Sequence, residues 1–172
     1  KDIKTINSNR HLTWQMAVNY VLENKFTNVN LGNEQMAAVS SIAGYTQEQF
    51  EKLQEIYEYS KRRVKSSIPH IEERTDDYTY ETLRLDDPLG LAIGTLTDCC
   101  QEIDDVAEVC MEHSMTSSDG RIFVIKDKEN NIVAQSWVWR NQNVLCFDNI
   151  EIPHKAFERA SQKKINLTQV VY

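Results

Sequence analysis

Glycine and proline are scarce in this sequence, with 5 and 3 of them among 172 residues, and no long apolar run occurs. A collagen-like repeat needs glycine at every third position, and low-complexity disordered chains are usually rich in both residues, so these two classes are excluded. A membrane-spanning helix needs about 20 consecutive apolar residues, which are lacking, so we expect no membrane partner. What is present, 41% hydrophobic and 26% charged residues, is typical of a globular protein with one core.

Positive charge is also in deficit, because 19 lysines and arginines face 26 aspartates and glutamates, a net charge of -7. Proteins that bind nucleic acid without regard to sequence usually present a net basic face to the phosphates, so that class of partner is not expected. The one basic run, residues 61–65, follows several glutamates and is typical of a helix C-terminus, where the macrodipole favours cations. A phosphate-binding or partner-binding patch is the alternative.

A secretory signal is lacking as well, since no basic start is followed by an apolar run. We therefore expect a cytoplasmic location, in which cysteines stay reduced. The four cysteines are Cys99, Cys100, Cys110 and Cys146. The chain begins at Lys1 without methionine and ends at Tyr172 in mid-pattern, which indicates a portion of a longer protein. Nothing in the sequence indicates the oligomeric state.

Helical patterns dominate residues 1–69, for which we predict a small N-terminal helical region. Apolar residues spaced along one helix face occur within residues 14–21 and 36–42. The capping-box spacing of Thr46-Gln47-Glu48-Gln49 opens a longer third helix. Pro69 disfavours helical geometry in the residue before it and closes the region.

Residues 70–172 predict a mixed α+β region that begins with a charged linker over 70–77. Alternating apolar and polar residues over 78–85 predict a strand, and residues 91–115 predict mostly helix with an interruption near Asp104-Asp105. Within that helical stretch the candidate core positions include Ile103, Val106 and Val109.

Three runs rich in Val, Ile, Phe and Trp come next, separated by short Asn-rich turns, and predict an antiparallel meander. These runs span residues 121–126, 132–139 and 144–152. Because the runs are apolar on both faces, we expect helices to cover the sheet on both sides. Pro153 suits the first turn of a covering helix that reaches Ala160. The predicted fold class is α+β, an antiparallel meander covered by helices and preceded by a helical region.

The order of elements over residues 78–160, strand, two helices, three strands and a helix, resembles the first half of the GNAT acetyltransferase fold. In that family the fourth strand holds the acyl-coenzyme A arm by its backbone and often carries a glutamate that acts as general base. The resemblance implies an acyl-CoA-dependent N-acyltransferase with acetyl-CoA as cofactor. The matching strand here carries Asp148 and Glu151, to which the role of base could be transferred.

One departure from that family leaves a second function open. The family places a glycine-containing loop after the fourth strand to cradle the cofactor pyrophosphate, whereas residues 150–160 contain no glycine. Cofactor-binding residues are therefore not assigned. The alternative is a non-catalytic binding or accessory protein on an acetyltransferase-like scaffold that has lost or changed its ligand, with a small molecule or a protein as partner.

Three segments also look like parts of proteins from phages and other bacterial mobile elements. They are Thr97-Asp98-Cys99-Cys100-Gln101, Ala134-Gln135-Ser136-Trp137-Val138-Trp139 and Phe147-Asp148-Asn149-Ile150-Glu151. This resemblance implies a mobile-element protein and brings no activity with it.

Trp137 and Trp139 fall on one face of their predicted strand together with Gln135 and Val133, because side chains two apart share a face. The two rings and Gln135 could form the base of a substrate-binding pocket. The alternative is that the rings only pack beneath a covering helix.

Asp148 and Glu151 lie in an otherwise apolar strand, where burial would raise a carboxyl pKa toward a value useful for a general base. An offset of three residues puts them on opposite faces of a regular strand. The alternative is that both carboxylates only accept hydrogen bonds from loop amides.

Cys99, Cys100, Cys110 and His113 carry ligand types that zinc prefers. No paired cysteine motif completes a set of four ligands, so we expect reduced, metal-free cysteines. Two alternatives to a zinc site remain, small buried hydrophobic side chains and a nucleophilic cysteine assisted by His113.

Overall fold

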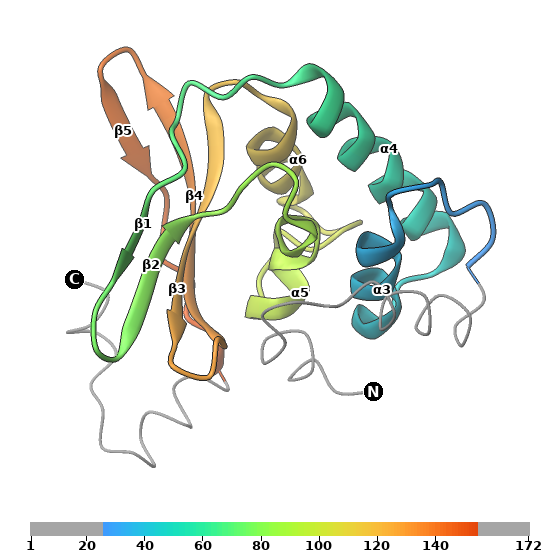
Figure 1. Cartoon of the computed structure of the whole chain (residues 1–172), viewed down its shortest axis with the longest axis horizontal. Helices are drawn as coiled ribbons and strands as arrows, with labels where there is room; N and C mark the ends of the chain where they lie inside the picture. Colours follow the sequence, from blue (N-terminus) through green and yellow to red (C-terminus); the bar gives the residue numbers. More distant parts are fainter. Residues whose placement is uncertain (1–25, 155–172) are drawn as a thin grey trace.

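The computed structural model describes residues 26–154, which form an α+β fold of helices beside one antiparallel sheet (Figure 1). In this part of the chain the helices are α3 (Glu34–Ala43), α4 (Gln47–Arg63), the 3-10 helix η1 (Pro88–Ala92), α5 (Ile93–Thr97) and α6 (Glu108–Thr116). The strands are β1 (Glu72–Arg74), β2 (Tyr78–Thr82), β3 (Gly120–Asp127), β4 (Ile132–Asn141) and β5 (Val144–Phe147). The helix predicted within residues 14–21 lies outside the described residues.

The five strands follow one another across the sheet in chain order, each antiparallel to its neighbour. The predicted meander is confirmed as β3, β4 and β5. Its turns contain Asn130 and Gln142, which adopt φ angles of 64° and 55°. A left-handed backbone of this kind is tolerated by single residues in tight turns. The sequence did not predict β1, because its three residues, Glu-Glu-Arg, are all exposed and carry no apolar pattern.

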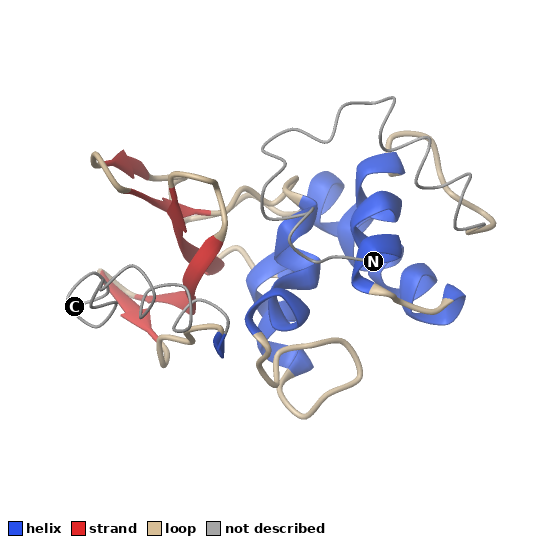
Figure 2. Ribbon diagram, turned by 90° about the horizontal axis from the view of Figure 1, so that it is seen from below, coloured by secondary structure: helices blue, strands red, loops and turns tan. Residues whose placement is uncertain are grey.

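The described helices all lie on one side of the sheet (Figure 2). Large side chains of α3, α4, η1, α5, α6 and β3 form one buried cluster there, which includes Phe50, Leu53, Met111 and Ile122. On the other face a smaller cluster of Ile125, Val133 and Ala134 is joined by Tyr78, Tyr80, Phe123, Ile150 and Ile152. The helix predicted to start at Pro153 lies almost wholly outside the described residues. The division of the chain at residues 69 and 70 stays a prediction.

Two of the predicted core positions are wrong. Ile103 is buried, but Val106 and Val109 are 88% and 66% exposed. The helix begins only at Glu108, so residues 98–107 are turns rather than helix. Within α6 the buried side chains are those of Met111, Ser114 and Met115, and Val109 lies on a different face.

Helix α4 begins at the predicted capping box. The Thr46 hydroxyl accepts a hydrogen bond from the Gln49 amide at 3.2 Å, and the Thr46 amide donates to Gln49 Oε1 at 3.0 Å. The basic residues Lys61, Arg62 and Arg63 occupy its last turn, as the charge pattern predicted. None of the described helices has the length and apolarity needed to cross a membrane.

We expect Thr46→Ala to lower the free energy of unfolding by about 1 kcal/mol, because the Gln49 amide loses its acceptor. The measurement is the urea midpoint of the purified chain. Thr27→Ala is a matched control, since the Thr27 hydroxyl makes no hydrogen bond among the described residues. An equal midpoint for the two variants would show that the cap does not stabilise α4.

Candidate functional site

Trp137 and Trp139 lie together on the helix-facing side of β4, as predicted. Their ring centroids are 4.6 Å apart with planes tilted by 36°. The His113 ring of α6 meets Trp137 edge-on at 5.3 Å. Both tryptophans are half-buried, so the pair is a partly open aromatic surface rather than a sealed core.

His113 is held in one tautomer between two partners. An indole N–H can only donate, so Nδ1 of His113 accepts the hydrogen bond from Trp137 Nε1 at 3.1 Å. In the neutral ring the proton is then on Nε2, which lies 3.4 Å from Asp119 Oδ1. The sequence placed His113 beside the cysteines but did not indicate its contact with Trp137.

Gln135 lies beneath this surface rather than on it. Its side chain is fully buried, and Nε2 donates weakly to Cys99 Sγ at 3.5 Å. Its Oε1 is buried without a hydrogen-bond partner among the described residues. An unsatisfied buried carbonyl is unfavourable, so Gln135 can accept a hydrogen bond from any donor that reaches it.

Val133 does not lie on the same face of β4 as Gln135, so the prediction from simple alternation is wrong for Val133. The pairing of β3 with β4 shifts register between Ile125 and Lys126. Val133 is the residue that this shift leaves without a partner, and it joins the cluster on the far side of the sheet, with Ile125 and Ala134. A bulge inserts one residue into a strand, so side chains beyond the bulge lie on the opposite face from the one that simple alternation predicts.

A second irregularity lies after β5, which ends at Phe147 rather than near residue 152. The Asp148 amide still donates to the Trp137 carbonyl at 2.9 Å, and Gln135 and Glu151 exchange two backbone hydrogen bonds of 2.9 and 2.8 Å. From Trp137 to Gln135 the backbone of β4 covers two residues, whereas from Asp148 to Glu151 the partner segment covers three. The extra residue makes residues 148–151 a β-bulge. The amides of Asn149 and Ile150 have no hydrogen-bond partner within residues 26–154.

The bulge brings both predicted bases to the same face. Asp148 lies opposite Trp137 and Glu151 opposite Gln135, and these β4 residues share the helix-facing side. The expectation that the two carboxylates lie on opposite faces is therefore wrong, because the extra residue cancels the odd offset. Both carboxylates are half-buried.

Two cysteines lie close enough to these carboxylates to be affected by them. Burial raises the pKa of Cys99, and the charge of Glu151 adds to the effect. Burial likewise raises the pKa of Cys110, with a further contribution from Asp148. Both groups are therefore held as thiols, which opposes the alternative of a nucleophilic cysteine.

The cysteines do not gather into a metal centre in the part of the chain described. Cys99, Cys100, Cys110 and Cys146 are unpaired thiols. Within residues 26–154 the one group of three ligand side chains with atoms inside 4.8 Å of one another is His70, Glu72 and Glu81. Arg74 pairs with Glu72 and Lys126 with Glu81, so salt bridges already occupy that group.

Comparison of the chain with protein-family models, curated proteins and solved structures finds no match. Fold and side-chain geometry are therefore the basis for assigning a function.

Proposed function

We propose that the protein binds an acyl-coenzyme A at the edge of β5 and transfers the acyl group to an amine, with Glu151 or Asp148 as general base. The observation that carries the proposal is the bulge at residues 148–151. It sets two carboxylates beside Trp137 on one face and leaves two neighbouring amides unbonded. Bulges are common next to active sites, where they redirect side chains.

The edge position of β5 suits the extended, amide-containing arm of the cofactor. Among the described strands β5 is the last of the sheet, so its outer backbone groups face no further strand. An extended ligand can add to such an edge by main-chain hydrogen bonds. The free amides of Asn149 and Ile150 would then donate to the acyl carbonyl oxygen, where negative charge develops during transfer.

The residues at the bulge supply the remaining chemistry. A carboxylate removes a proton from the substrate ammonium, the amine nitrogen bonds to the acyl carbon, and the carbon–sulfur bond breaks. The nitrogen loses a second proton as the amide forms, and the leaving sulfur takes up a proton to become the thiol. Trp137 and Trp139 offer a flat, half-buried surface against which the amine substrate can pack.

One observation favours the alternative, a non-catalytic binding or accessory protein. Ile150 and Ile152 pack on the cluster at the far side of the sheet, and Pro153 is buried. Apolar packing thus occupies the stretch where a phosphate cradle would start, and no glycine lies within residues 150–160. We accordingly expect weak affinity for the cofactor.

Calorimetric titration with acetyl-CoA tests the proposal. We expect binding in the millimolar range, retained in Glu151→Gln and Asp148→Asn, with turnover reduced at least about 100-fold in the variant that lacks the base. Glu112→Gln is the matched control, because Glu112 is exposed on α6 and its carboxylate has no partner among the described residues. Absence of binding at millimolar acetyl-CoA would overturn the transferase and leave the binding protein.

A further inference from the structure

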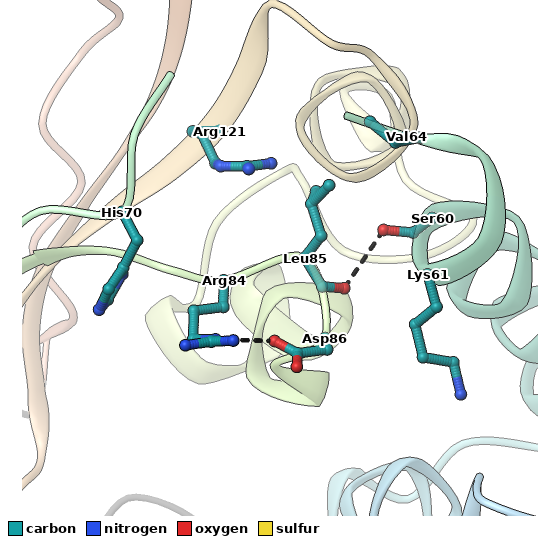
Figure 3. A pocket seen from close by; sticks show the side chains of 8 residues that line it. All are labelled: Ser60, Lys61, Val64, His70, Arg84, Leu85, Asp86 and Arg121. Atoms are coloured by element: carbon teal, nitrogen blue, oxygen red, sulfur yellow. Dashed lines mark hydrogen bonds and ion pairs between the residues drawn. The ribbon is translucent and has the colours of Figure 1, made fainter. Parts of the chain in front are cut away.

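A basic pocket lies where the end of β2, the start of β3 and the last turn of α4 meet (Figure 3). Its volume is about 530 Å³, and its lining includes Lys61, Arg84, Arg121 and one carboxylate, Asp86. Three cations and one carboxylate leave a formal charge of +2 with histidine neutral, in a chain whose net charge is -7. The pocket is therefore positively charged although the chain as a whole is negatively charged.

Arg121 is the unusual member of this pocket. It is only 7% exposed, and its Nε and Nη1 are buried without a hydrogen-bond partner within residues 26–154. No carboxylate of the described residues forms a salt bridge with it. Figure 3 shows the guanidinium extending from β3 toward Leu85 and the end of α4. A buried, unpaired charge is strongly unfavourable, which indicates that an anion completes the site.

The other polar side chains of the pocket are largely occupied, so they do not neutralise Arg121. Arg84 Nε pairs with Asp86 Oδ1 at 3.1 Å. His70 Nδ1 lies 2.6 Å from the Thr82 carbonyl, which can only accept, so the proton of that bond belongs to His70.

Lys61 is a second cation of the pocket, and it forms no salt bridge within residues 26–154. Its Nζ donates to Asn33 Oδ1 at 2.7 Å and lies 4.1 Å above the Tyr57 ring. Both partners are neutral, and burial lowers the pKa of Lys61 despite nearby glutamates. Burial also lowers the pKa of Arg121, with no charged neighbour contributing. Lys61 is exposed to solvent, so Arg121 is the cation whose charge lacks compensation.

We propose that this pocket binds the phosphate group of a small phosphorylated molecule, with the Arg121 guanidinium as its principal ligand. A guanidinium donates charge-assisted hydrogen bonds to phosphate oxygens, and Nε and Nη1 of Arg121 have no partner among the described residues. The pocket volume exceeds that of a single phosphate, which leaves room for an organic part. The residues that line the pocket are different from Trp137, Trp139, Asp148 and Glu151, which make up the proposed acyl-transfer site. The inference therefore does not depend on the proposed acyl transfer.

Thermal unfolding with inorganic phosphate, ribose 5-phosphate or acetate at equal ionic strength tests the inference. We expect both phosphates to raise the melting temperature of the wild-type chain by roughly 3 to 6 °C at about ten times their dissociation constant, and acetate to have a smaller effect. When the two phosphates are compared at one and the same concentration, a larger shift with ribose 5-phosphate identifies an organic phosphate as the ligand, and an equal shift identifies free phosphate. No shift with either phosphate, or an equal shift with acetate, would overturn the inference.

Three variants separate binding from folding. Arg121→Met is expected to weaken phosphate binding at least about tenfold while the ligand-free chain stays as stable or becomes more stable. Arg63→Met removes the same charge from an exposed site on α4 outside the pocket, and should keep the wild-type shift. Asp86→Asn removes the one carboxylate and should tighten binding several-fold. A phosphate shift that Arg121→Met retains in full, or that Asp86→Asn weakens, contradicts the assignment.

Discussion

Gly94→Ala is expected to lower the free energy of unfolding by about 3 to 4 kcal/mol, which is about 10 °C in melting temperature for a chain of this size. A Cβ built at Gly94 lies 2.0 Å from the amide nitrogen of Glu102 and 2.4 Å from the carbonyl carbon of Gln101. Both atoms belong to the backbone of the turn after α5, so no rotation of a side chain can relieve the overlap. The turn has to move away from the buried helix, and its packing is lost.

Gly32→Ala is the matched control for this prediction. Gly32 has a φ of 89° and no atom within 4 Å of an added Cβ, so only the left-handed backbone opposes alanine there. That conformation costs roughly 1 to 2 kcal/mol. Guanidinium denaturation of both variants measures the difference. If Gly94→Ala unfolds at the same midpoint as Gly32→Ala, the backbone of residues 101–102 does not lie as close to Gly94 as the structure shows.

Gly120→Ala is expected to lower the free energy of unfolding by about 2 to 3 kcal/mol and to disturb the site as well. An added Cβ would lie 2.5 Å from the His113 carbonyl oxygen and 2.7 Å from its Nδ1. Nδ1 is the atom that accepts the hydrogen bond from Trp137. Relief of the overlap therefore separates α6 from β3 and breaks the contact between His113 and Trp137.

Tryptophan fluorescence and near-UV circular dichroism report that contact directly, alongside the denaturation midpoint. Gly90→Ala is the control, because its added Cβ would meet the flexible end of Met115, whose Sδ lies at 2.7 Å. We expect Gly90→Ala to leave the indole spectra unchanged and to cost less stability. Unchanged spectra in Gly120→Ala would mean that this glycine does not make room for His113.

Local sequence patterns were sufficient to predict the start of α4, the turns of the meander and the pairing of the two tryptophans on one strand face. Thr46 and Gln49 form a capping box wherever a helix begins after them, and the Asn-rich turns place the boundaries of β3, β4 and β5. The side-by-side position of Trp137 and Trp139 follows from the two-residue period of a strand. Each of these features depends on residues only a few positions apart, so the sequence by itself was sufficient for them.

Only the tertiary structure decided which side chains meet. The bulge at residues 148–151 turns Asp148 and Glu151 to one face, and the register shift at Ile125 sends Val133 to the other. A bulge arises from the fit of two strands to each other, and an alternating pattern read along one strand cannot reveal it.

The same reason explains why the sequence showed only part of the basic pocket. It marked Lys61 within a basic run, but Arg121 reads as the first polar residue of a strand. What makes Arg121 a ligand is burial without a partner, which depends on where β2 and α4 end in space. Burial is set by elements far apart in the chain, so composition and spacing determined the α+β fold, whereas packing between those elements decided both sites.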